Sequence, residues 1–359
     1  MNIYDLTKEE LENYFINNNS KKFHAGQLFS WLYEKKIKDY NQVTDLKKDI
    51  LEKLKKDLPI KRDKIIDVQR DKDVNKYLFE LEDKEHIEAV LMMHDYGLSV
   101  CISSQVGCNM SCKFCESGRR KKVRNLTTSE MVGQILSIEE DINKRISHVV
   151  IMGIGEPFDN YENVINFVKI INDSKGLQIG SRHITISTSG IVPKIEEFAN
   201  FPYQVNLAIS LHAPNDELRE KIMPINKRYP LKELMTSIKN YIDKTNRRVT
   251  FEYIMLKDIN DREKDAEELS NLLKGLNAYV NLIPYNETKN IEFKRSSTFQ
   301  IMKFYDILKK NNINVTIRRE FGSKISAACG QLRSDKEELW KHFIKQMQEK
   351  YVIIMKIVL

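Results

Sequence analysis

The sequence predicts an α/β protein with six β/α units around a mostly parallel sheet, preceded by a small N-terminal helical domain. Two observations support this fold class. From residue 98 onward, short apolar segments typical of strands alternate with amphipathic segments typical of helices. Before residue 60, apolar residues recur only at helical spacing. We therefore divide the chain into a helical domain (1–60), connecting strands (61–97), a core (98–345) and a C-terminal tail (346–359).

Three helices are expected in the N-terminal domain. Residues 7–10 have the sequence of a capping box, which opens a helix over residues 11–17. The second helix covers residues 25–33, and the third covers residues 46–58 and ends at Pro59. Lysine clusters on these helices suggest an RNA-binding accessory domain, but exposed lysines are equally compatible with a plain packing module.

The core strands are expected to be short and apolar, with amphipathic helices between them. The expected strands cover residues 98–102, 148–153, 183–187, 205–210, 249–255 and 279–283. One helix is expected to begin near Ser129, and three others are expected over residues 164–172, 231–243 and 267–276. Active-site groups should lie on the loops that follow the carboxyl ends of the strands.

Three cysteines with the spacing CxxxCxxC, Cys108, Cys112 and Cys115, lie in the loop after the first core strand. A structural zinc site needs a fourth ligand, and an ordinary four-iron cluster needs a fourth cysteine. The two other cysteines, Cys101 and Cys329, lie outside this segment. The spacing favours an iron-sulfur cluster held by three thiolates with one iron left open. A zinc knuckle completed by Cys101 or a histidine is the alternative.

The composition is that of a globular protein with a sizeable core, because 41% of the residues are hydrophobic and 30% are charged. Five cysteines without an N-terminal apolar signal segment indicate a reducing compartment, and we expect the cytoplasm. Apolar runs are strand-sized, so no membrane association is expected. Basic stretches at residues 119–124 and 318–319 flank candidate chemical residues, as a polyanionic substrate requires; two solvated loops are the alternative.

Polar residues recur where the predicted strands end. Residues 153–157 close the second strand, where glycines allow close backbone approach and Glu156 can accept hydrogen bonds from an ammonium group. Ser187, Ser210, His212 and Asn286 occupy equivalent positions after later strands. Any one of them could cap a helix, but their recurrence favours a shared pocket.

CxxxCxxC is the signature of the radical S-adenosylmethionine (SAM) enzymes, which this segment resembles, and the predicted core is similar to their open partial (β/α)6 barrel. A more extensive similarity, from about residue 20 to residue 335, is to the RlmN/Cfr family of RNA methyltransferases. The segments that carry it are residues 103–110, 124–127, 182–188, 207–212, 223–226 and 327–332.

This resemblance implies a role for each candidate residue. Cys108, Cys112 and Cys115 would ligate a [4Fe-4S] cluster. Cys329 would become S-methylated, Cys101 would resolve a covalent protein–RNA adduct, and Glu88, thirteen residues before Cys101, would accept a proton. The implied SAM contacts are Gly155, Glu156, Ser187, Ser210, Leu211, His212 and Asn286.

The implied reaction is methylation of adenine carbon 2, in 23S rRNA at the peptidyl transferase centre and in tRNA at the adenine 3' to the anticodon. Two SAM molecules would be used per turnover, because one methylates Cys329 and the second yields the radical that activates the methyl group. A reducing electron donor such as flavodoxin or ferredoxin is implied. We expect a monomer.

Two departures from the family pattern bear on loop geometry and RNA preference. Glu116 stands where a small residue is usual after the third cluster cysteine, and residues 322–326 replace an acidic run before Cys329. Two alternatives remain. One is the Cfr-type enzyme, which modifies adenine carbon 8 of 23S rRNA and confers antibiotic resistance. The other is an RNA-binding iron-sulfur sensor in which Cys101 and Cys329 are structural thiols.

Overall fold

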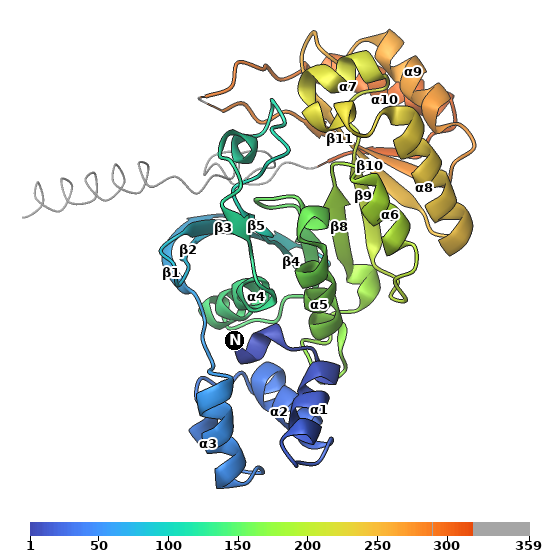
Figure 1. The fold of residues 1–359 in the computed structure, drawn as a ribbon. Coiled ribbons are helices and arrows are strands. Elements are labelled where there is room, and N and C mark those ends of the chain that lie inside the picture. Colours follow the sequence, from blue (N-terminus) through green and yellow to red (C-terminus); the bar gives the residue numbers. More distant parts are fainter. Residues whose placement is uncertain (289, 319–359) are drawn as a thin grey trace, which may run out of the picture.

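One ten-stranded sheet forms the centre of the computed structural model, which describes residues 1–288 and 290–318 (Figure 1). Its strand order is β1-β2-β3-β4-β7-β8-β9-β10-β11-β12. The strands of this sheet are β1 (Lys64–Asp71), β2 (Val74–Glu80), β3 (His86–His94), β4 (Gly97–Cys101), β7 (His148–Ile151), β8 (Ile184–Thr188), β9 (Asn206–Ser210), β10 (Val249–Met255), β11 (Ala278–Pro284) and β12 (Val315–Ile317). Cys329 and residues 322–326 lie outside the described residues.

The predicted α/β class is confirmed, with a partial barrel of parallel strands from β4 and β7 to β12. Each of the six predicted core strands has its counterpart in β4 and β7–β11. Strands were also expected between residues 61 and 97, but the sequence did not predict where they lie in the sheet. β1, β2 and β3 pair antiparallel, and β3 pairs with β4, so they continue the same sheet. The predicted boundary at residue 97/98 falls within the β3–β4 pair, and the division into domains stays a prediction.

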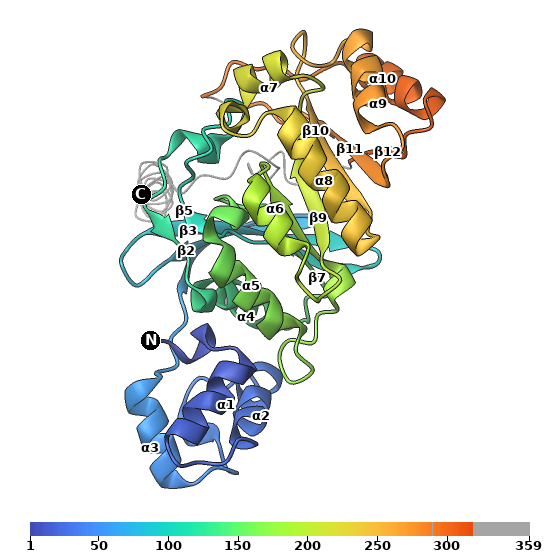
Figure 2. The same cartoon turned by 45° about the vertical axis from the view of Figure 1, so that its right-hand side comes forward.

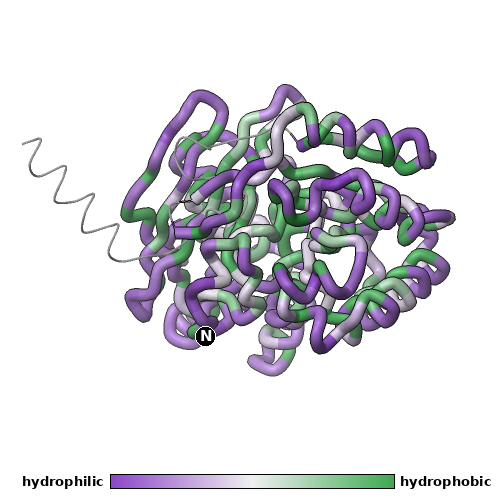
Figure 3. Tube along the Cα trace, turned by 90° about the horizontal axis from the view of Figure 1, so that it is seen from above, coloured by the Kyte–Doolittle hydropathy of each residue, from purple (hydrophilic) through white to green (hydrophobic). Residues whose placement is uncertain are grey.

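Helices cover the outer surface of the curved sheet, as two views show (Figures 1 and 2). They are α4 (Thr128–Ile142), α5 (Tyr161–Asn172), α6 (Val192–Phe198), α7 (Asp216–Ile222), α8 (Leu231–Thr245), α9 (Glu263–Leu273) and α10 (Thr298–Lys310). The sequence indicates α4, α5, α8 and α9 but not α6, α7, α10 or the short strand β12. Hydrophobic segments gather inside and hydrophilic ones outside (Figure 3). No helix in the described part of the chain is long and apolar enough to cross a membrane.

Three further helices form a group below α4 in Figure 1: α1 (Lys8–Asn17), α2 (His24–Phe29) and α3 (Lys48–Asp57). The predicted capping box is present, because Thr7 Oγ1 accepts from the Glu10 N–H and the Glu10 carboxylate accepts from the Thr7 N–H (2.8 Å). Polar contacts tie this group to α4. The Ser129 N–H donates to Asp5 (2.9 Å), and Lys36 pairs with the buried Glu139 (2.8 Å).

The carboxyl ends of β4 and β7 meet at very close range. The Gly153 N–H donates to the Ile102 carbonyl (3.0 Å), so the two chains continue side by side past the strands. A Cβ on Gly153 would lie 2.6 Å from the Ile102 oxygen and 2.8 Å from the Ser103 nitrogen. Only glycine fits here, because the atoms it would meet are backbone atoms with no side-chain freedom.

Replacing Gly153 with alanine should therefore destabilise the protein by about 1–3 kcal/mol, the usual range for overpacking a close contact. Gly26→Ala is the matched control, because Gly26 lies in α2 and a methyl group there would have nothing within 4 Å. That control should stabilise by about 0.5–1 kcal/mol. Urea unfolding measures both; equal effects of the two substitutions would contradict the steric account.

Candidate active site

The three clustered cysteines lie on a loop that a two-stranded ribbon closes at its base. The ribbon pairs β5 (Gln105–Val106) with β6 (Arg124–Asn125). Within the loop the Cys108 N–H donates to the Arg120 carbonyl (2.9 Å), and the Cys115 N–H donates to the Cys112 carbonyl (3.2 Å). Cys108 is buried, whereas Cys112 and Cys115 are half-buried and pack on an apolar cluster that includes Phe114 and Met223.

Burial disfavours the thiolate forms of Cys108 and Cys112 unless a cation lies nearby. Burial raises the pKa of Cys108 to about 12, and the pKa of Cys112 is raised by burial and by the charges of the other two cysteines. A metal centre supplies the positive charge that stabilises such thiolates. No group of three His, Cys, Asp or Glu side chains within residues 1–288 and 290–318 forms a site for a single metal ion.

Glu156 is the best-anchored of the predicted contacts. Its carboxylate accepts from the Phe158 N–H (3.0 Å) and from the Ser189 N–H (2.7 Å), and its own N–H donates to Gln105 (2.9 Å). Burial raises the pKa of Glu156, while the backbone hydrogen bonds act against that rise. Gly155 has φ +112°, and a Cβ there would lie 2.7 Å from the Gln105 Cβ, so glycine is needed at that turn.

The other predicted contacts lie at or just after the carboxyl ends of β8, β9 and β11. The hydroxyls of Ser187 and Ser210 are 3.4 Å apart. Leu211 is fully buried, and its N–H donates to the Glu252 carbonyl (3.1 Å). Asn286 is buried two residues beyond the end of β11.

His212 is a buried, neutral imidazole. Its Nδ1 accepts from the Ile254 N–H (3.0 Å), so the neutral ring carries its proton on Nε2. Its backbone is left-handed (φ +58°), and the ring stands edge-on to Phe114 (4.8 Å between centroids). Burial, with the charge of Arg219 adding to it, lowers the pKa of His212 to about 3.

Arg219 of α7 is a functional candidate that the sequence analysis did not single out. It is fully buried, and its guanidinium donates to the carbonyls of Ser189 (2.6 Å) and Leu211 (3.2 Å) and to the side chain of Asn226 (3.0 Å). Burial lowers its pKa to about 10, whereas the charge of Cys112 acts to raise it. Arg219 is therefore a fixed cation between two strand ends and the cysteine loop. Its place in the segment DELR gave no signal, since such arginines are usually solvated.

Glu88 and Cys101 share one face of the sheet. Cys101 pairs with Val90 in the β3–β4 register, and Glu88 lies two residues from Val90 on β3. Residues that pair across antiparallel strands, and residues two apart in one strand, point to the same side. Cys101 packs there with Val90 and Ile154. The carboxylate of Glu88 pairs with Lys76 (3.0 Å), and both side chains are buried.

The basic stretch after the cysteines is engaged with carboxylates. Arg120 pairs with Glu85 (2.5 Å), Lys122 with Asp159 (2.6 Å), and Arg124 with both Asp83 (2.6 Å) and Glu130 (2.7 Å). These ion pairs fix the loop against the sheet. They favour a structural role for most of this stretch over the phosphate-binding role considered from the sequence.

Comparison with known proteins gives two matched regions and several relatives. The radical SAM superfamily matches residues 102–270, and the N-terminal domain of ribosomal RNA large subunit methyltransferases matches residues 1–60. A protein of Enterococcus faecalis named probable dual-specificity RNA methyltransferase RlmN is 53% identical over 341 residues, which are 92% of this chain and 96% of that protein. A protein of the same name from Acholeplasma laidlawii is 51% identical over 335 residues, 93% of this chain and 99% of that protein.

A solved structure extends the similarity to the fold. The crystal structure of a radical SAM methyltransferase from Sphaerobacter thermophilus superposes with a TM-score of 0.88 at 42% identity. The alignment covers 93% of this chain and 100% of that chain.

The neutral state of His212 predicts how stability depends on pH. Below about pH 6.5 a histidine of the unfolded chain takes up a proton, whereas folded His212 stays neutral until about pH 3. The unfolded state then binds more protons, so the free energy of unfolding decreases as the pH falls. Between pH 7 and pH 5 this group should account for a loss of about 2 kcal/mol.

His212→Asn should remove that part of the pH dependence. Asparagine tolerates the left-handed backbone, and its Oδ1 can accept from the Ile254 N–H as Nδ1 does. Urea unfolding of both proteins at pH 7 and pH 5 measures the difference. The same pH dependence in variant and wild type would show that His212 is not the responsible group.

Proposed function

The chain belongs to the RlmN family of radical SAM RNA methyltransferases, and from this premise we propose that it methylates carbon 2 of adenine through a covalent protein–RNA intermediate. Identity of 53% over nearly the full length of a relative with that family name carries the proposal. The placement of Glu88 and Cys101 on one interior face supports it, because both would act on the same adduct.

The residues present fit the groups that the family requires. Cys108, Cys112 and Cys115 would hold a [4Fe-4S] cluster, since they lie on one loop closed by the β5–β6 ribbon, and the thiols of Cys108 and Cys112, whose pKa values are raised, need a cationic partner to ionise. SAM would lie along the strand ends, with its ammonium near Glu156 and its remaining polar groups near Ser187, Ser210, Leu211, His212 and Asn286. Gly155 allows the turn before Glu156 to adopt its left-handed backbone (φ +112°) against Gln105. With both groups bound, the centre supplies a 5'-deoxyadenosyl radical.

The protein's own residues would then act in a fixed order. Cys329 first takes a methyl group from one SAM molecule, which leaves as S-adenosylhomocysteine. The methyl group on Cys329 would lose a hydrogen atom to the radical that a second SAM supplies, and the resulting methylene radical would bond to the adenine carbon. Glu88 would accept the proton that this carbon releases, and the electron that also leaves the adduct would pass to an oxidised one-electron acceptor such as the iron-sulfur cluster. The Cys101 thiolate would then attack the Cys329 sulfur, so that a disulfide forms while the carbon–sulfur bond breaks. The released methylene carbon would take up a proton, and the methylated base would leave.

We further propose the substrates and setting that follow for such an enzyme. They are 23S rRNA at the peptidyl transferase centre and tRNA at the adenine 3' to the anticodon. Two SAM molecules are consumed per turnover, a flavodoxin or ferredoxin supplies electrons, and the enzyme works as a cytoplasmic monomer. The group of α1–α3 would serve as the accessory RNA-binding domain, supported by the match of residues 1–60 to the N-terminal domain of rRNA methyltransferases.

The product identifies the reaction. Anaerobically reconstituted protein, given RNA, SAM and a reductant, should yield 2-methyladenosine in nucleosides analysed by mass spectrometry against both methyladenosine standards. The matched control is Cys112→Ala, which should lose iron, sulfide and all SAM cleavage, because two thiolates cannot hold the cluster. Formation of 8-methyladenosine would instead assign the Cfr-type reaction. SAM cleavage without methylated RNA would contradict both the carbon-2 and the carbon-8 reaction. An iron-sulfur sensor would release no 5'-deoxyadenosine.

Cys101 and Cys329 should act at different steps of the reaction. Cys329→Ala should stop the reaction before any covalent complex forms. Cys101→Ala should still load methyl and add to the base, but RNA should stay bound to Cys329, because no thiolate remains to release it. Denaturing gels after turnover measure the adduct, and Cys101→Ala/Cys329→Ala is the control that should show none. Multiple turnovers by Cys101→Ala would contradict the resolving role.

A further inference from the structure

A large cavity lies inside the partial barrel, toward the amino ends of the strands, with a volume of about 1110 Å³. Inward-facing residues of β4 and β7–β11 line it, among them Ser99 and Thr185. Each of these two lies two residues before a candidate site residue, Cys101 or Ser187, on the same strand. Because alternate residues face the same side, the cavity continues the interior surface on which the candidate site lies.

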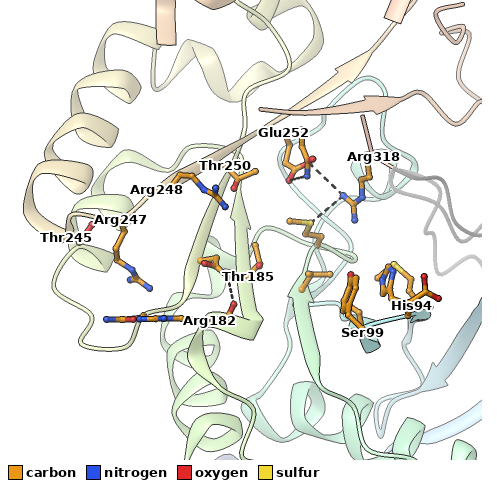
Figure 4. A pocket seen from close by; sticks show the side chains of 18 of the residues that line it. His94, Ser99, Arg182, Thr185, Thr245, Arg247, Arg248, Thr250, Glu252 and Arg318 are labelled. Atoms are coloured by element: carbon orange, nitrogen blue, oxygen red, sulfur yellow. Dashed lines mark hydrogen bonds and ion pairs between the residues drawn. The ribbon is translucent and has the colours of Figure 1, made fainter. Parts of the chain in front are cut away.

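Three arginines line this cavity at the amino edge of the sheet: Arg182, just before β8, and Arg247 and Arg248, just before β10. We call this space the arginine pocket. Figure 4 shows the three on one side of it, across from His94 and Arg318. The side chains come from two strand starts that are far apart in sequence and meet on one wall.

Neutral groups hold these guanidinium groups in place. Arg182 donates to the side chain of Gln204 (2.8 Å), and Arg247 donates to the carbonyls of Tyr203 (3.1 Å) and Val205 (2.5 Å). Arg248 lies over the ring of Tyr279 (4.7 Å). These contacts fix the positions of the three cations without neutralising their charge.

The pocket's carboxylates are elsewhere. Glu252 faces Arg318, whose Nη1 is 3.8 Å away, and Asp95 lies on the turn between β3 and β4. Among the described residues, 1–288 and 290–318, no carboxylate forms an ion pair with Arg182, Arg247 or Arg248. Three like charges on one wall repel one another, and an anion between them would remove that repulsion.

Aromatic rings form the rim beside the arginines. Tyr96 is 66% exposed and stacks on His94 (4.5 Å between centroids), and it meets His148 edge-on (5.1 Å). His148 in turn stacks on His183 (4.3 Å), the neighbour of Arg182. An exposed ring beside a cationic wall is the combination that single-stranded nucleic acid uses, with bases on the ring and phosphates on the cations.

We propose that the arginine pocket binds the phosphate backbone of the RNA strand flanking the target nucleotide, with one base of that strand stacked on Tyr96. The proposal rests on the proposed function, because it takes RNA as the substrate. It adds a second contact region, at the opposite end of the strands from the cysteine loop, for the same RNA. Phosphate is the recognised chemistry, and its source, an RNA strand or a small free anion, is what the experiment separates.

The test is the salt dependence of RNA binding, measured by fluorescence anisotropy with a labelled RNA hairpin that carries an adenosine in its loop. Arg182→Gln/Arg248→Gln should flatten the log–log slope of affinity against salt by about 1.4, since each contact to a single strand contributes about 0.7. Lys232→Gln/Lys239→Gln is the control. It removes the same charge from the exposed outer surface of α8 and should leave the slope within about 0.3 of wild type.

Stacking is tested separately. Tyr96→Ala should weaken RNA binding about tenfold, whereas Tyr96→Phe, which keeps the ring, should restore it to within about twofold. Phe299→Ala removes an even more exposed ring (75%) from α10 and should have no effect. None of these variants should reduce SAM cleavage without RNA, because none of the residues lies at the cysteine loop.

Each other outcome decides against the proposal. Equal slopes for the arginine variant and the lysine control, with RNA methylation intact in wild type, would overturn the pocket's role and leave the proposed function standing. Saturable one-to-one binding of inorganic phosphate, lost in Arg182→Gln/Arg248→Gln while the RNA slope is unchanged, would assign a small-anion site instead. A wild-type protein that neither binds nor methylates RNA would overturn the proposed function together with this inference.

Discussion

The junction between the ends of β4 and β7 is the constraint on which the rest of the site depends. Ser103 Oγ donates to the Glu88 carbonyl (2.6 Å) and accepts from the Ile154 N–H (3.0 Å), so one hydroxyl connects β3, the cysteine loop and the turn that carries Gly155. Gln134 of α4 accepts from the Ser103 N–H (2.9 Å) and fixes the junction against the outer helix layer. Glu88, Cys101 and the turn that carries Gly155 are thus fixed relative to one another by hydrogen bonds between these side chains and the backbone.

Charge in the site is arranged with few compensating partners. Arg219 holds a buried positive charge by hydrogen bonds to carbonyls and an amide, and His212 stays neutral beside it. The thiols of Cys108 and Cys112 are raised in pKa, so the metal-free site favours uncharged sulfur. Arg219 therefore places a buried positive charge near Cys112 and the loop that carries the three clustered cysteines. A buried charge of this kind acts on the energy of any electron added nearby.

The sequence predicted the parts of this fold that depend on local patterns. The capping box at Thr7, the six core strands and the helices α4, α5, α8 and α9 follow from spacing and end signals. It did not predict that β1–β3 extend the core sheet. The periodicity of a sequence predicts a strand, but it does not identify the strand with which that strand pairs. The sequence analysis assigned no role to Ser103 and Gln105, because each accepts a hydrogen bond from a backbone N–H that is distant in sequence. The sequence likewise could not predict the ion pairs of Lys76, Arg120, Lys122 and Arg124, because folding brings their partners close.

The order of the strands in the central sheet, β1-β2-β3-β4-β7-β8-β9-β10-β11-β12, never departs from their order along the chain. A chain emerging from the ribosome could therefore add each new strand to an edge already in place, without inserting one between two earlier neighbours. The cysteine loop is synthesised well before the segment around Ile222, whose carbonyl accepts from the Lys113 N–H (2.9 Å). During synthesis the three clustered cysteines are thus complete before their apolar cover exists, and the nascent chain passes through a stage in which these thiols face the solvent.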